Sequence, residues 1–239
     1  MTNIYEAIFT RKSVNKFEKV PLNKKTIDEI EEFIAEVPPL LPEAQITHEI
    51  VTADAVKGFA LPNAPQFMLL YGKDQPLREA CAAFQHEHVV LYLHSQGFAA
   101  HWLSSVSPKE KDPNFIIGFA FGTPAEPATR ELTEFDRKPV SEIATGADLR
   151  LDATRLAPSG MNGQPWYFIV EDDHIFVYCK QKLDGFKGMF YNQTKVDIGL
   201  ALAHLKIASN YEGGSFEFTT EVNNWPEAPS GYSYIGAVR

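Results

Sequence analysis

The predicted elements occur in the same order twice along the 239-residue chain, and this repeat limits the fold more than any other feature. In each half, a helical pattern is followed by prolines, two short apolar runs, a long helical pattern and a further apolar run. Within the short window of residues 39–51, four residues match those 119 positions later, which are Pro39 with Pro158, Gln45 with Gln164, Ile50 with Ile169 and Val51 with Val170. The sequence therefore predicts an α+β chain of two diverged half-domains, residues 1–135 and 136–239.

Helices are predicted where apolar residues recur every three or four positions after a polar capping residue. Asn3 and Asn23 are the expected caps of the first two helices, and the prolines from Pro38 onward stop the second. The predicted helices are 3–11, 23–37, 77–97, 148–156 and 196–209, and the predicted strands are 48–53, 66–71, 115–121, 166–171, 175–179, 215–221 and 234–238. Each half is expected to form a mostly antiparallel sheet flanked by helices.

The composition is that of an ordinary globular protein, with 44% hydrophobic and 22% charged residues. The longest apolar run is far shorter than the roughly 20 residues that span a bilayer. The first residues also lack the order of charges that marks a secretory signal. The only two cysteines, Cys81 and Cys179, form no CxxC pair, which is typical of a reducing compartment. We therefore expect a cytoplasmic protein that does not bind membranes.

The net charge of −9 argues against a nucleic-acid partner, because an acidic surface repels phosphate backbones. The first 25 residues differ from the rest of the chain, because they contain six cationic residues and only two acidic ones. The cationic residues are Arg11, Lys12, Lys16, Lys19, Lys24 and Lys25, and the acidic residues are Glu6 and Glu18. A solvated surface segment is the ordinary interpretation of such a cluster. The alternative is a local site for a small phosphate-bearing ligand.

Several common catalytic motifs are absent from the sequence, including the phosphate-binding GxxxxGK[ST] loop, GxGxxG and GxSxG. His86-Glu87-His88 is not an HExxH zinc motif. On a helix the two histidines point about 200° apart and cannot share one metal ion, so we expect both on a helix surface. No metal site is predicted.

The segment Arg11-Lys12-Ser13-Val14-Asn15-Lys16-Phe17 follows the first predicted helix directly. It offers cations, a hydroxyl and an amide within a few residues. These groups suit a phosphate monoester, because they give charge-assisted hydrogen bonds to its oxygens. The competing interpretation is a basic segment that follows a helix and binds no ligand.

A second segment, Ala157-Pro158-Ser159-Gly160-Met161-Asn162-Gly163-Gln164-Pro165-Trp166, leads into a predicted strand. Proline, serine, glycine and asparagine are turn residues, so a plain loop would explain most of it. However, the amides of Asn162 and Gln164 beside an indole are groups that a heterocycle could use. The small residues would let the backbone approach a planar ring closely.

These two segments resemble the RRSVRxF and APSxxNxQPWxF signatures of the nitroreductase-like flavin oxidoreductases. Ordinary members carry both signatures in one short N-terminal stretch and bind FMN at a dimer interface. This chain has one signature in each predicted half, so it is similar to a single-chain branch with two fused half-domains. The resemblance implies a pseudo-dimer that binds one FMN at the seam between its halves. Because the usual dimer is then fused in one chain, the chain is expected to be able to act as a monomer.

The resemblance also implies which residues bind FMN. The phosphate and ribityl side is assigned to Arg11, Lys12 and Ser13 together with Arg137, whose DRKP context resembles a C-terminal phosphate-binding arginine of the family. The ring edge is assigned to Pro158, Ser159, Gly160 and Asn162, with Gln164 in support. The backbone amides of Leu103 and Ser104 are expected near flavin N5 and O4.

Asn15 departs from the family pattern, because many members have Lys or Arg there, near flavin N1 and O2. That cation favours the reduced anionic flavin, so Asn15 is expected to make reduction harder or slower. Trp102 and Phe186 are candidate lid residues, although core packing is the favoured role of each.

The implied activity is FMN-dependent oxidoreduction, in which NAD(P)H reduces the flavin and a nitroaromatic or quinone-type acceptor then reoxidises it in a ping-pong cycle. The cofactor carries the electronic chemistry, so no protein acid or base is assigned. One alternative is a flavin-binding store or sensor without turnover, and another is an α+β protein without flavin. The acceptor and the choice between NADH and NADPH stay open.

Overall fold

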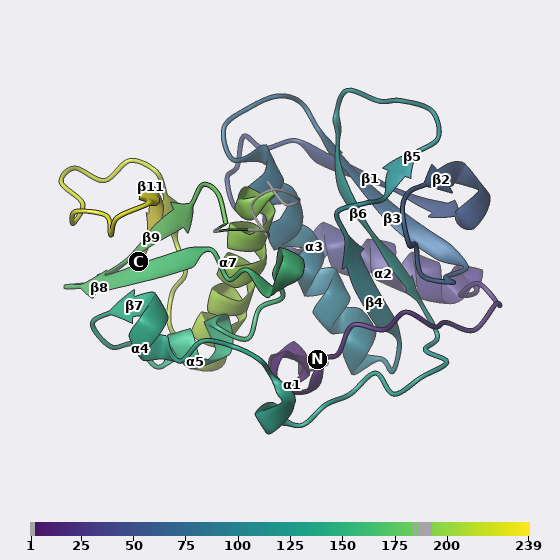
Figure 1. Cartoon of the computed structure of the whole chain (residues 1–239), viewed down its shortest axis with the longest axis horizontal. Coiled ribbons are helices and arrows are strands. Elements are labelled where there is room, and N and C mark those ends of the chain that lie inside the picture. The colour runs from purple at the N-terminus through teal and green to yellow at the C-terminus, as the bar shows by residue number, and fades with distance from the viewer. Residues whose placement is uncertain (1–2, 184, 186–192) are drawn as a thin grey trace. The chain divides into compact units, whose positions relative to one another are not determined.

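The computed structural model describes residues 3–183, 185 and 193–239. The chain divides into two compact units, which we call unit 1 (residues 1–134) and unit 2 (residues 135–239). Each unit contains its own β-sheet and one long, largely buried helix, shown in purple to teal for unit 1 and in green to yellow for unit 2 (Figure 1). The predicted α+β class is confirmed.

Unit 1 is built on an antiparallel sheet with the strand order β1-β3-β6-β4. The long helix α3 contacts this sheet, and α1 and α2 pack against α3. A separate short pair joins β2 and β5. The bounds are α1 (Ile4–Thr10), α2 (Lys24–Glu36), β1 (Ile46–Thr52), β2 (Val56–Lys57), β3 (Gln66–Gly72), α3 (Arg78–Ser95), β4 (Ala99–Leu103), β5 (Ser107–Pro108) and β6 (Phe115–Gly122), with 3₁₀ turns at Ala53–Ala55 and Leu132–Glu134.

The helix ends of unit 1 follow from the residues that cap them. The side chain of Asn3 accepts a hydrogen bond from the Tyr5 amide at 3.2 Å. Asn23 accepts one from the Thr26 amide at 3.0 Å, which satisfies a donor that has no partner inside α2. Gly97 follows α3 with a φ of +82°, the left-handed conformation that ends many helices. The predicted caps are therefore confirmed.

His86 and His88 do not lie on a helix surface, so that prediction is wrong. Their exposed fractions are 1% and 5%, because α3 is covered by the sheet and by the other helices of unit 1. Each Nδ1 lies within hydrogen-bonding distance of the carbonyl oxygen four residues earlier, at 2.9 Å from Ala82 and 2.8 Å from Phe84. The two rings point to different neighbours, as expected from their helical spacing.

The stability of the chain should depend on pH through His86. Burial, followed by the influence of His48, lowers the pKa of His86 from 6.5 to about 3. The unfolded chain therefore takes up this proton first, and the contribution of His86 to stability is lost as the pH falls below 6.5. Between pH 7 and pH 5 we expect the free energy of unfolding to fall by about 2 kcal/mol for this group. Urea unfolding of the wild type and of His86→Leu at both pH values checks this, since an equal pH dependence in both would contradict it.

Unit 2 contains a five-stranded sheet with the order β10-β11-β9-β8-β7, which is antiparallel except for the β7–β8 pair. The long helix α7 contacts this sheet and packs against α5. The bounds are α4 (Val140–Ile143), β7 (Ala144–Thr145), α5 (Arg150–Thr154), a 3₁₀ turn (Gly160–Asn162), β8 (Trp166–Glu171), β9 (His174–Lys180), α7 (Thr194–Tyr211), β10 (Phe218–Thr219) and β11 (Tyr232–Val238).

The structure departs from the predicted elements mainly where an element is short or lies at a sheet edge. The predicted strand 215–221 is reduced to β10, because only two of its residues pair with β11. The short elements β2, β5, α4 and β7 and the five-residue strand β4 were not predicted. Two-residue pairings carry too few alternating positions to leave a pattern in the sequence.

Candidate functional site

The basic segment of unit 1 is held by a second segment from the end of the same unit. Arg11 forms a β-bridge with Thr129. The amide of Lys12 donates to the carbonyl of Ala128, and the amide of Arg130 donates to the carbonyl of Thr10, both at 2.9 Å. Residues 10–12 and 128–130 therefore form a short antiparallel ribbon that fixes the backbone of the basic segment.

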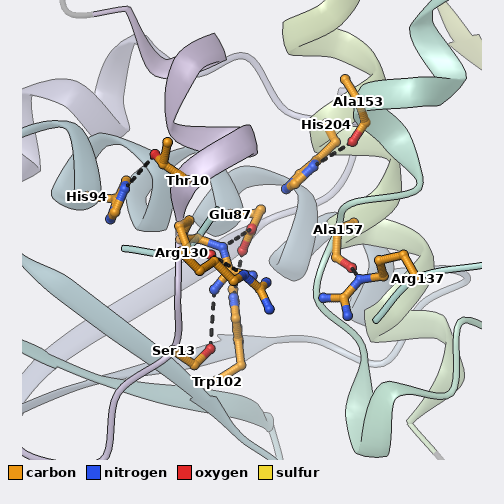
Figure 2. A network of polar contacts seen from close by, with 11 residues as sticks. Thr10, Ser13, Glu87, His94, Trp102, Arg130, Arg137, Ala153, Ala157 and His204 are labelled. Atoms are coloured by element: carbon orange, nitrogen blue, oxygen red, sulfur yellow. Dashed lines mark hydrogen bonds and ion pairs between the residues drawn. The ribbon is translucent and has the colours of Figure 1, made fainter. Parts of the chain in front are cut away.

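Arg11 is buried, with an exposed fraction of 3%, and it lies beside the fully buried carboxylate of Glu87 on α3. Its Nε is 3.9 Å from Oε1 of Glu87. The indole N–H of Trp102 on β4 donates to Oε2 of the same carboxylate at 2.7 Å (Figure 2). One carboxylate therefore connects the segment after α1 with β4, the strand that ends at Leu103.

The electrostatics of this cluster follow from burial. Burial lowers the pKa of Arg11, and the charge of Glu87 partly offsets the effect. Burial, together with the neighbouring positive charge of Arg11, lowers the pKa of Arg130 to about 10. An arginine keeps its proton at neutral pH under these conditions, so two guanidinium charges lie close together in unit 1.

The exposed residues of the basic segment present their groups to solvent. Ser13 is exposed, and its Oγ accepts a hydrogen bond from Nη1 of Arg11 at 3.2 Å. A guanidinium has no acceptor, so the hydroxyl hydrogen of Ser13 cannot be donated to Arg11 and can be donated to another group. Lys12 and Asn15 are also exposed. The amides of Asn15 and Lys16 donate to Oε1 of Glu126, at 2.6 and 3.1 Å.

Of the two residues expected near flavin N5 and O4, Leu103 ends β4 and is buried, whereas Ser104 follows the strand and is exposed. Trp102 is half-buried and is fixed by its hydrogen bond to Glu87 and by contact with the ring of Phe119. These contacts favour the packing interpretation of Trp102 over a lid. Phe186 lies outside the described residues.

In unit 2, the loop before β8 has an unusual backbone. Met161, Asn162 and Gln164 all adopt positive φ values, of 52°, 52° and 47°. Residues with a Cβ rarely adopt this conformation, which costs on the order of 1 kcal/mol or more each. Such strain persists only where surrounding contacts hold it in place.

Those contacts come from Asp136, Arg137 and Lys138. Arg137 donates from Nε to the carbonyl of Ala157 at 3.0 Å (Figure 2). Its Nη1 donates to Oδ1 of Asn162 at 2.7 Å. The side-chain Nδ2 of Asn162 donates to the backbone carbonyl of Asp136 at 2.8 Å. The backbone amide of Lys138 donates to Oε1 of Gln164 at 2.8 Å. The structure thus brings together the predicted residues Arg137, Asn162 and Gln164.

The other end of the loop is tied to the long helix of unit 2. The amide of Gly160 donates to Oδ1 of Asp197 at 2.9 Å, and Asp197 is buried in α7. The hydroxyl of Ser159 accepts from the amide of Gln164 at 3.0 Å. A Cβ on Gly163 would lie 2.5 Å from Cδ1 of Leu183, so this loop position has room only for glycine without a shift of Leu183. Pro158 is half-buried at the start of the loop.

A pocket of about 420 Å³ opens beside this loop within unit 2. Its wall includes cations, acids, two carboxamides and one tyrosine ring: Asp136, Arg137, Lys138, Pro139, Glu142, Asn162, Gly163, Gln164, Lys180, Leu183 and Tyr232. This wall is more polar than that of most small-molecule sites, which are lined mainly by apolar side chains.

Four residues that support the predicted site were missed by the sequence reasoning: Glu87, Arg130, Asp136 and Asp197. Asp136 directly precedes the predicted Arg137, so its position was visible. The other three are far along the chain from the segments they support, and no motif marks them. The assigned cofactor roles of the predicted residues stay predictions.

No cluster of three or more His, Cys, Asp and Glu side chains in the described part of the chain is arranged to hold a metal ion. Among the same residues, no helix combines the length and the apolar character needed to cross a membrane.

Comparison with solved structures shows that the fold is nitroreductase-like. A protein described as a "putative nitroreductase" from Thermotoga maritima MSB8 has a TM-score of 0.70 and 19% identity, over 99% of this chain and 93% of that chain. A nitroreductase family protein from Clostridium difficile 630 matches 62% of this chain and 100% of its own, with 16% identity and a TM-score of 0.49. A "putative nitroreductase" in complex with FMN from Desulfovibrio desulfuricans matches 59% of this chain and 95% of its own, with 15% identity and a TM-score of 0.46.

No curated protein matches the chain. A protein-family model described as "Putative TM nitroreductase" matches residues 3–209, which is well over half of the chain. The resemblance drawn from RKSVNKF and APSGMNGQPW is thereby confirmed. The chain belongs to this nitroreductase family.

Proposed function

We propose that the chain is an FMN-dependent oxidoreductase that takes electrons from NAD(P)H and passes them to nitroaromatic or quinone-type acceptors. The observation that carries the proposal is the way in which the two signature segments, residues 11–17 and 157–166, are held in place. Each is fixed in its own unit by contacts from elsewhere in that unit, through Glu87 in unit 1 and through Asp197 in unit 2. Segments held in this way are preorganised for a ligand.

The donors in unit 1 suit a phosphate monoester. Ser13 offers a hydroxyl whose oxygen already accepts from Arg11, and Lys12 offers an exposed ammonium group. Hydroxyl and ammonium donors of this kind form strong hydrogen bonds to phosphate oxygens. We propose that Arg11, Lys12 and Ser13 hold the phosphate and ribityl side of FMN, and that Asn15, Leu103 and Ser104 lie near the ring.

The donors in unit 2 suit the polar edge of a flavin ring. The carboxamides of Asn162 and Gln164 are held in one orientation by Arg137 and Lys138. Gly160 has no side chain, which would let a ligand approach the loop backbone closely. We propose that Pro158, Ser159, Gly160 and Asn162 line the ring edge, supported by Gln164, and that Arg137 binds on the phosphate side of FMN.

When bound, FMN would supply the hydride and electron-transfer chemistry. The chain's own residues would bind it, orient it and exclude part of the surrounding water. Asn15 carries no charge, so it would stabilise a reduced, anionic ring less than a lysine would. No residue needs to act as a general acid or base in this proposal.

We also propose that the two units descend from one nitroreductase-like half-domain and that residues of both bind a single FMN per chain. A sheet with one long buried helix in each unit supports this origin. The chain would then be able to work as a monomer in the cytoplasm.

The test is an anaerobic reduction experiment on the FMN-loaded protein. NADH or NADPH should bleach the visible band of oxidised flavin, and a nitroaromatic or quinone should restore it. A yellow protein that stays oxidised with both nucleotides would instead be a flavin store or sensor. A protein that takes up no FMN would contradict the proposal altogether.

A further inference from the structure

The basic motif of unit 1 does not contain all the positive charge that lies next to it. Within the motif, Arg11 is almost fully buried and lies beside the carboxylate of Glu87. Part of its charge is therefore already balanced inside the protein. A further cation beside the motif, in addition to Lys12, would strengthen the binding of a ligand with two negative charges.

Arg130 is in the right place to be that cation. The ribbon of residues 10–12 and 128–130 puts it beside the motif through the hydrogen bond from its amide to the carbonyl of Thr10 at 2.9 Å. Its side chain turns back toward the motif, because Nε donates to the carbonyl of Arg11 at 3.0 Å (Figure 2). Unlike Arg11, Arg130 is only half-buried.

The orientation of the side chain gives Arg130 a chemical role. A guanidinium is planar, so a hydrogen bond from Nε fixes the direction of its two terminal nitrogens. Terminal nitrogens in a fixed plane match the oxygens of a phosphate group in a two-point contact.

The charges around Arg130 also favour an anion. The nearby positive charge of Arg11 disfavours the charged form of Arg130, and Glu134 partly compensates for this. Glu87 serves the same purpose for Arg11. An anion bound next to both guanidinium groups would relieve the repulsion between them.

We propose that Arg130 is a phosphate-binding residue of the flavin nucleotide site, acting together with Arg11, Lys12 and Ser13. This inference rests on the proposed function and adds a residue that lies outside the signature motif. It predicts that Arg130 distinguishes FMN from riboflavin, which has the same ring and side chain but no phosphate.

The experiment measures the affinities of the apo protein for FMN and for riboflavin by flavin fluorescence. Arg130→Gln should weaken FMN binding by about 10- to 100-fold, because a charged hydrogen bond is lost. Riboflavin binding should not change. Arg130→Lys should give an intermediate loss for FMN, since it keeps the charge and loses the planar fork.

Arg78→Gln is the matched control, because Arg78 is also a partly buried arginine of unit 1 with a carboxylate partner, Glu79. It should leave both affinities unchanged. Equal loss of FMN and riboflavin binding in Arg130→Gln, or no loss at all, would overturn the inference while the proposed function stands.

If the wild type binds neither flavin, the proposed function fails, and the inference is then decided with inorganic phosphate. A rise in the melting temperature with phosphate that disappears in Arg130→Gln would still support an anion site at this residue. The absence of that rise in the wild type would overturn it.

Discussion

Glu87→Gln is expected to destabilise the chain by about 3–5 kcal/mol at neutral pH, because it leaves the buried guanidinium of Arg11 without its counter-charge. The exposed fractions of the two side chains are 4% for Arg11 and 0% for Glu87, so water cannot replace the lost carboxylate. Glutamine has the same shape, and its amide oxygen can still accept from Trp102. The substitution therefore removes the negative charge of Glu87 and keeps both its shape and its acceptor for Trp102. Urea unfolding of both proteins measures the difference.

Two further variants make this result interpretable. Glu49→Gln removes an exposed carboxylate of the same unit, which accepts a hydrogen bond from the hydroxyl of Tyr71 at 3.2 Å, and it should change stability by less than about 1 kcal/mol. Replacing both partners, in Arg11→Met with Glu87→Met, should recover much of the loss, since neither buried charge then remains. A Glu87→Gln protein as stable as the wild type would show that Glu87 does not balance Arg11.

Asp197→Ala is expected to destabilise the chain by about 1.5–3 kcal/mol and to weaken FMN binding. The carboxylate of Asp197 accepts from the amide of Gly160 at 2.9 Å and is buried in α7. Without it, the amide loses its partner, and the strained loop that follows loses one of its two attachments. Unfolding in urea and titration with FMN measure the two effects.

Asp197→Asn is the matched variant, because its amide oxygen can still accept from Gly160. It should retain more of the FMN affinity than Asp197→Ala does. If both variants bind FMN as tightly as the wild type, the loop of residues 159–164 does not depend on α7, and its role in FMN binding would lose its structural support.

Local signals predicted the elements whose causes are local. Asn3 and Asn23 cap their helices as expected, and the strand predicted at 166–171 is observed as β8. The environment of α3 was not predicted. Its apolar spacing indicated a helix with one buried face, whereas the sheet and the helices α1 and α2 bury α3 on several sides. The burial of His86 depends on those distant partners.

The same distinction applies to the candidate site. The signature segments were visible because they are continuous in sequence and rich in polar and small residues. Their supports, Glu87, Arg130 and Asp197, are brought to them only by the tertiary fold. Each is an ordinary charged residue in sequence, so only its observed burial or bonding reveals its role.

The most direct test of the central claim is the absorbance spectrum of the FMN-loaded chain, recorded before and after anaerobic addition of NADH or NADPH. We predict one oxidised flavin for each chain, followed by loss of its visible band when the preferred nucleotide is added. Absence of bound flavin, or a flavin that neither nucleotide reduces, would contradict the account.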